Sequence, residues 1–170
     1  MTERPRDLRG DVVAWVEKAE QDWIAAGSLD PSVIPTVICF HCQQCAEKYL
    51  KALLTLHNRV PPRTHDLGVL LDSALGREPD LLDVSDELLL LDRYAVAIRY
   101  PGPDADEQEA FTAASAAAIV RDACRRLLGL AEVEESEAED AHEPDEADEC
   151  DEGGQNAANN TIGASRADQS

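Results

Sequence analysis

The sequence predicts an all-α fold, an up-and-down bundle of about five helices followed by an acidic C-terminal tail. Alanine, leucine, glutamate and aspartate are frequent, whereas aromatic residues make up 4% of the 170 residues. This composition favours helix over sheet. Five segments carry apolar residues at helical spacing, and proline or glycine separates them. Short links between amphipathic helices are typical of a bundle.

The first two helices are predicted from their apolar faces and their ends. Asp11 can cap the first helix, which we expect to end at Gly27 and Ser28. The second helix is expected to begin at Pro35, because the N–H group that proline lacks would be unpaired in the first turn anyway. This helix runs to about His57 and is the longest uninterrupted helical signal in the chain.

The other three predicted helices lie farther along the chain. Thr64 is the expected N-cap of a short helix over 65–75. A leucine-rich helix over 85–98 must end before Pro101. The last helix, over 106–130, is rich in alanine, so a neighbouring helix can approach it closely.

The negative charge is concentrated near the C-terminus. Residues 1–131 carry 14 basic and 21 acidic side chains, a charge of −7, and residues 132–170 carry 1 and 14, a charge of −13. We therefore predict a helical domain over 11–131 and a disordered acidic tail over 132–170. The acidic balance also excludes nucleic-acid binding by a broad basic surface, so any such contact must be local.

The cysteines bear on both location and metal binding. The charged start of the chain predicts neither a signal peptide nor a membrane span, so we expect a cytoplasmic protein whose cysteines are thiols. Cys39, Cys42 and Cys45 share the spacing of part of an iron–sulfur run. On a helix these thiols spread over about a third of the circumference, which does not suit one metal. We expect them to be small core residues, with no bound metal or cofactor.

One group of candidate binding residues lies on the second predicted helix. Gln43, Lys48 and Lys51 are expected on its exposed face, and Lys51 is placed to pair with Glu47 one turn away. These side chains could contact a ligand or a partner. The alternative is a solvated helix face with one stabilising ion pair.

Arg99 and Tyr100 form a second candidate group, directly before Pro101. A guanidinium beside a tyrosine ring can contact a phosphate and a base. Alternatively, Arg99 only interacts with the dipole at the end of the fourth helix. No P-loop, GxGxxG, GxSxG or HExxH pattern is present, so the enzyme classes with those motifs are unsupported.

Three segments match one known family in order and spacing. They are the run from Cys39 to Leu54, Thr64-His65-Asp66-Leu67, and Arg93-Tyr94 with Arg99-Tyr100-Pro101. Together they resemble the HEPN domain (higher eukaryotes and prokaryotes nucleotide-binding), over about residues 11–130. The resemblance implies a bundle that is usually homodimeric and often encoded beside a minimal nucleotidyltransferase, in a pair similar to a toxin and its antitoxin.

The resemblance also raises the question of catalysis. Many members of the family are metal-independent ribonucleases with an Arg-x4–6-His motif near a late helix, in which His is the acid or base and Arg stabilises the phosphate. Here no His follows Arg93 or Arg99 within that reach, and the Arg99-Tyr100-Pro101 form is that of the non-catalytic branch. Arg59 and His65 have the required spacing but lie in the predicted loop after the second helix.

The sequence thus predicts a non-catalytic HEPN-type module, acting as a homodimer without a membrane role. Its expected ligand is a nucleotide or RNA, its expected partner a nucleotidyltransferase, and its binding residues are Gln43, Lys48, Lys51, Arg99 and Tyr100. One alternative is a ribonuclease toxin that uses Arg59 and His65, or Arg99 with a group from a partner. Another is a purely structural dimerisation bundle.

Overall fold

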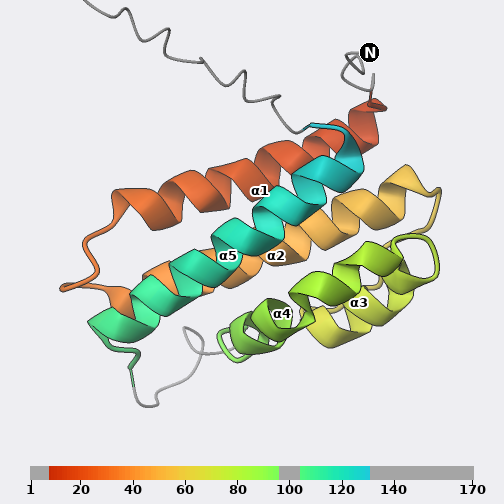
Figure 1. The fold of residues 1–170 in the computed structure, drawn as a ribbon. Helices are drawn as coiled ribbons and strands as arrows, with labels where there is room; N and C mark the ends of the chain where they lie inside the picture. Colours follow the sequence, from red (N-terminus) through yellow and green to blue (C-terminus); the bar gives the residue numbers. More distant parts are fainter. Residues whose placement is uncertain (1–7, 96–103, 131–170) are drawn as a thin grey trace, which may run out of the picture. The chain divides into compact units, whose positions relative to one another are not determined.

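The computed structural model describes residues 8–95 and 104–130, which all belong to one compact unit. Within these residues the chain forms five α-helices and one 3-10 helix, and no strand occurs. In chain order they are α1 (Gly10–Ser28), α2 (Pro35–Leu56), α3 (Leu67–Leu75), η1 (Pro79–Val84), α4 (Ser85–Asp92) and α5 (Glu107–Leu128). The predicted all-α bundle is confirmed (Figure 1). The tail predicted over 132–170 lies outside the described residues.

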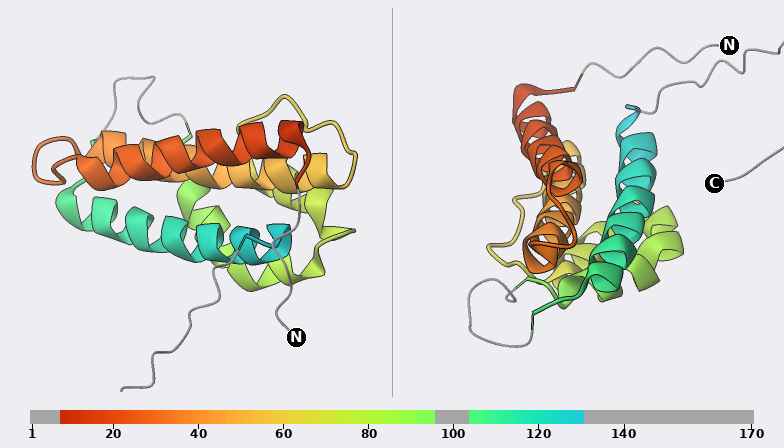
Figure 2. Two further views of the ribbon diagram at one scale, coloured as in Figure 1. Left: turned by 90° about the horizontal axis from the view of Figure 1, so that it is seen from above. Right: turned by 90° about the vertical axis from the view of Figure 1, so that its left-hand side faces the viewer.

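Helix α2 is the central element of the bundle. It packs against α1, α3, α4 and α5, and α1 runs antiparallel to it (Figure 1). Figure 2 shows α1 on one side of α2 and α5, and the α3–α4 pair on the other. The start of α1 and the ends of α2 and α5 therefore lie at the same end of the bundle.

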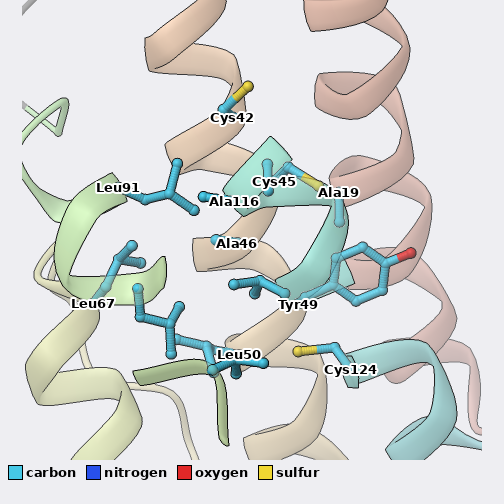
Figure 3. Packing of buried hydrophobic residues seen from close by; sticks show 14 of the residues in the cluster. Ala19, Cys42, Cys45, Ala46, Tyr49, Leu50, Leu67, Leu91, Ala116 and Cys124 are labelled. Carbon is cyan, nitrogen blue, oxygen red and sulfur yellow. The ribbon is translucent and has the colours of Figure 1, made fainter. Parts of the chain in front are cut away.

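The core is built around α2, and Figure 3 shows part of it. Residues 49–55 are all buried, as expected for a helix that neighbours surround on every side. The side chains around the middle of α2 come from all four neighbouring helices, among them Ala19 of α1, Leu67 of α3, Leu91 of α4 and Cys124 of α5.

The cysteines of the described residues are part of this core. Cys39, Cys42, Cys45 and Cys124 are free thiols with no exposed surface. Burial raises the pKa of Cys39 to about 11, and the pKa of Cys42 and of Cys124 to about 12. The expectation that the first three cysteines are small core residues is confirmed. In the described part of the chain, no group of three or more His, Cys, Asp or Glu side chains could hold a metal ion.

Both ends of α5 are fixed by local hydrogen bonds. The side chain of Asp106 accepts from the Glu109 N–H group at 2.8 Å, and the side chain of Glu109 accepts from the Asp106 N–H group at 3.1 Å. This capping box satisfies two N–H groups that an open helix end would leave unpaired. Gly129 follows the helix with φ of 73°, a left-handed conformation that glycine adopts without steric cost. The predicted span of 106–130 was therefore slightly too long at each end.

Two predicted N-caps were wrong. Arg9, not Asp11, is the N-cap of α1, and Asp11 lies in the first turn, where its charge suits the helix dipole. For α3 the cap is Asp66, whose side chain accepts from the Val69 N–H group at 2.9 Å. Thr64 instead accepts a hydrogen bond from the Asp66 N–H group, so it orders the turn that precedes the helix.

The predicted fourth helix is divided differently in the structure. Helix η1, whose first residue is Pro79, was not among the predicted elements. Helix α4 ends at Asp92, and residues 93–95 form turns. The rest of the predicted helix over 85–98 lies outside the described residues. None of the described helices is long and apolar enough to cross a membrane.

Candidate functional site

A group of polar side chains lies where α2 meets the loop that leads to α3. We call it the Glu47 network, and its members are Gln43, Gln44, Glu47, Lys51 and His65. The Glu47 carboxylate accepts from Lys51 Nζ at 2.7 Å and from Gln44 Nε2 at 3.0 Å, and it lies 3.1 Å from Nδ1 of His65. Gln43 donates from Nε2 to the backbone oxygen of His65 at 3.0 Å. The network therefore ties the middle of α2 to this loop.

Burial and charge act in opposite directions on Glu47. Its side chain is 4% exposed and that of Lys51 is 10% exposed. Burial alone would raise the pKa of Glu47, but hydrogen bonds and charge from Lys51 and His65 outweigh it, so the pKa lies below its ordinary value. Glu47 is thus a buried carboxylate that stays ionised at neutral pH.

The network also orients the ring of His65. An ionised carboxylate can only accept hydrogen bonds, so we assign the proton of this contact to Nδ1 of His65. The His65 side chain remains 51% exposed. A half-exposed imidazole held by a buried carboxylate can act as an acid or base, or as a hydrogen-bonding group for a ligand.

Lys48 links the Glu47 network to a cluster between α1 and α2, because its Nζ donates to Gln44 Oε1 at 3.3 Å. Asp22 of α1 accepts a hydrogen bond from Lys48 Nζ, and its other oxygen lies 2.9 Å from Nδ1 of His41. The Lys48 side chain is 18% exposed. Its charge is therefore accessible from solvent but already has a carboxylate partner.

An open pocket of about 460 Å³ lies between the start of α1 and the end of α2. It is lined by Arg9, Asp11, Trp15, Thr55, Asn58, Arg59, Val60 and Pro61. The Arg9 guanidinium donates to the Thr55 carbonyl at 2.6 Å and to the Asn58 side chain, and it pairs with Asp11 at 3.1 Å. These contacts fix one cation in the wall of the pocket.

The pocket and the Glu47 network meet at Lys51, whose carbonyl accepts from Thr55 Oγ1 at 2.8 Å. Lys51 Nζ, which donates to Glu47, lies 5.5 Å from the centroid of the Trp15 ring. A cation over an aromatic face is attracted by the ring's quadrupole. Trp15 therefore packs against a buried charge of the network and also lines the pocket.

Comparison with known proteins identifies the family. A family model described as "HEPN domain" matches residues 12–127, which is more than half of the chain. The chain belongs to the HEPN domain family. No curated protein matched this chain.

A solved structure shares the fold of this HEPN domain. It is the crystal structure of TT1696 from Thermus thermophilus, which aligns with a TM-score of 0.56 and 23% sequence identity. The match covers 69% of this chain and 98% of that chain. At this identity the likeness supports the fold alone.

The HEPN bundle buries two of the predicted binding residues. Gln43 has no exposed surface, and Glu47 and Lys51 are also buried, so the expectation of an exposed helix face was wrong at these positions. The physical reason is the central place of α2, which leaves little of its circumference to solvent. The predicted pair of Glu47 with Lys51 is confirmed. Arg99 and Tyr100 lie outside the described residues.

Arg59 and His65 are held by different elements of the HEPN bundle. Arg59 donates from Nη1 to the backbone oxygen of Ser73 in α3, whereas His65 is held by Glu47 of α2. Both residues lie outside helices, between α2 and α3. The predicted helix over 65–75 included His65, whereas α3 begins at Leu67.

Sequence reasoning missed Arg9 and Trp15 as pocket residues. The spacing of Trp15 within the first helix indicates an apolar helix face and not a pocket, and Arg9 lies 46 positions before Thr55 and 49 before Asn58. Contacts over such distances leave no local pattern. The available signal was an arginine close to the start of the first helix, because an up-and-down bundle brings that start beside the end of the second helix.

Proposed function

We propose that this protein is a non-catalytic HEPN module that binds a nucleotide, a minimal nucleotidyltransferase partner, or both, as a homodimer in the cytoplasm. The observation that carries the proposal is the position of the histidines. None lies between His65 and His142, so α4 and α5 contain none. The late helices of this chain therefore lack the histidine of the Arg-x4–6-His motif that the family's ribonucleases carry.

Arg99, Tyr100 and Lys48 are the residues that we propose to contact the ligand or partner. The first 131 residues have a charge of −7, so a phosphate needs a local cation. Lys48 supports this role because its side chain is partly exposed. Gln43 and Lys51, which are buried, are proposed to act as positioning residues that hold α2 and the His65 loop.

Arg99→Ala tests this proposal, with adenosine monophosphate as the nucleotide probe. The variant should weaken binding by about 1.5 to 3 kcal/mol, the range for a hydrogen bond to a charged group, and should leave helix content unchanged. Arg93→Ala is the matched control, because Arg93 is exposed and donates to Leu90 and Tyr94 within its own turn. Unaltered calorimetric binding with a lowered melting temperature would make Arg99 a structural cap.

A metal-independent ribonuclease is the second candidate function. The observation that favours it is the half-exposed His65 ring held by the buried Glu47, because a carboxylate that fixes one ring nitrogen is a common way to orient a catalytic histidine. RNA cleavage that survives EDTA and disappears in His65→Ala, but not in His57→Ala, would support this function. If neither RNA cleavage nor ligand binding is detected, the remaining interpretation is a structural dimerisation bundle.

A further inference from the structure

We infer that the pocket between the start of α1 and the end of α2 binds a ligand that carries a phosphate next to a planar ring, such as a nucleotide. This inference rests on the nucleotide binding proposed above, and it adds Arg9, Trp15 and Arg59 to the residues that we propose to contact the nucleotide. The pocket of about 460 Å³ lies within the range of about 300 to 1,000 Å³ that is usual for small-molecule sites.

Two guanidinium groups provide the phosphate end of the site. Arg9 is held in place by the Thr55 carbonyl and the Asn58 side chain, so little side-chain entropy remains to be lost on binding. Arg59 donates from Nη1 to Ser73, and its other N–H groups have no hydrogen-bond partner within residues 8–95 and 104–130. A fixed guanidinium and one with open N–H groups, both in the lining of the same pocket, can bind a phosphate at two points.

The charge of the pocket differs in sign from that of the chain. Its lining contains two arginines and one acidic residue, Asp11, whereas the whole chain has a formal charge of −20. Asp11 pairs with Arg9 at 3.1 Å and therefore competes with a phosphate for that cation. An anionic ligand is attracted to this pocket by local charge and repelled by the rest of the protein.

Trp15 provides the surface for the ring of the ligand. Lys51 Nζ lies 5.5 Å from the centroid of the indole and covers one face of it. A ligand ring can therefore stack only on the other face of the indole. Val60, which is 91% exposed, lines the same pocket together with Pro61. Exposed apolar groups beside an aromatic ring favour a flat, poorly hydrated ligand ring.

The backbone at Asn58 shapes the pocket. Asn58 has φ of 57° and is the only non-glycine residue with positive φ in the described part of the chain. Asparagine tolerates this left-handed conformation better than most residues. The turn directs Arg59, Val60 and Pro61 along the pocket, and the Asn58 side chain accepts the hydrogen bond that holds Arg9.

The experiment uses the fluorescence of Trp15 and calorimetry of the full chain. The sequence has two tryptophans, so Trp23→Phe leaves Trp15 as the only one. Adenosine monophosphate should quench Trp15 fluorescence, and adenosine or inorganic phosphate alone should bind more weakly, because each offers one half of the ligand. A 5′-phosphorylated short RNA and its 5′-hydroxyl counterpart then distinguish a free nucleotide from the end of an RNA.

Charge variants test the phosphate end. Arg59→Gln should weaken binding of adenosine monophosphate on the order of tenfold, consistent with the loss of a charged hydrogen bond. Arg63→Gln is the matched control, because it removes the same charge from an exposed side chain of the same loop that does not line the pocket. Asp11→Asn should strengthen binding, because it removes the carboxylate that competes for Arg9.

Different results would contradict the pocket assignment and the proposed role of Arg99. If wild-type protein binds adenosine monophosphate, Arg59→Gln has no effect and Arg99→Ala weakens binding, the pocket assignment is overturned and the proposed function stands. Equal effects of Arg59→Gln and Arg63→Gln would also overturn the pocket. If calorimetry detects no nucleotide binding to wild-type protein, both the pocket and the nucleotide part of the proposed function are wrong.

Discussion

Glu47 and Glu20 each hold several polar partners, but their surroundings differ. Glu47 is 4% exposed and holds Lys51 and His65 beside the loop after α2. Glu20 is 25% exposed and accepts from Arg121 at 2.9 and 3.0 Å and from Arg125 at 3.1 Å, which joins α1 to α5. Glu20 also accepts from the hydroxyl group of Tyr49 of α2.

From this comparison we expect the contribution of each carboxylate to the stability of the fold to depend more on its burial than on the number of its partners. In both cases burial raises the carboxylate pKa, yet hydrogen bonds and positive charge outweigh it, so both pKa values lie below the ordinary value. Water can replace a lost partner at Glu20. It cannot do so at Lys51, whose side chain is 10% exposed, so we expect the fold to depend more on Glu47.

The largest effect is expected for Glu47→Gln. The substitution preserves shape but leaves the buried Lys51 ammonium without its counter-charge, which should lower the free energy of unfolding by about 3 kcal/mol. Chemical denaturation followed by circular dichroism measures the change. Glu17→Gln, at an exposed position of α1, is the control and should differ from wild type by less than about 0.5 kcal/mol. A change at Glu47 as small as the control would mean that the network contributes little.

A smaller effect is expected for Glu20→Gln. Arg121 and Arg125 are each 21% exposed, so both can be rehydrated when the carboxylate is removed. The free energy of unfolding should fall by about 1 to 2 kcal/mol, the scale of a partly exposed, bidentate ion pair. A loss larger than that of Glu47→Gln, measured in the same denaturation series, would reverse the comparison.

The smallest expected effect is a change with pH in the difference in free energy of unfolding between wild type and Glu47→Gln. A carboxylate whose pKa is lowered on folding stabilises the protein above its unfolded-state pKa, and this stabilisation is lost as the pH falls through the folded-state pKa. The ordinary pKa of Glu47 is 4.5, so the stability gap between wild type and Glu47→Gln should narrow below that pH. Denaturation at several pH values between about 7 and 3 measures the gap. A gap that stays constant over this pH range would show that folding does not lower the pKa of Glu47.

Local signals predicted most of the fold. Apolar spacing and the position of Pro35 located most of the helices, and α2 was predicted to within one residue of its observed end at Leu56. Cap choice was less predictable, because Thr64 and Asp66 both carry an oxygen that can accept from a helix N–H group. Only the path of the turn decided that Asp66 caps α3.

The candidate site was less predictable than the fold. The pair of Glu47 with Lys51 follows from helical spacing, but its burial does not, because burial depends on the four helices that surround α2. The contact of His65 with Glu47 spans 18 residues. The run of seven buried residues at 49–55 contains Lys51, and a lysine within a long apolar helix was the available sign of a buried ion pair.

The central claim is that Glu47 and Lys51 form a buried pair whose members depend on each other. A double-mutant cycle with Glu47→Gln and Lys51→Met tests it most directly by chemical denaturation. Each single variant should lose about 3 kcal/mol, whereas the double variant should lose clearly less than the sum, because no uncompensated buried charge remains. Additive losses, with a coupling energy near zero, would contradict the claim.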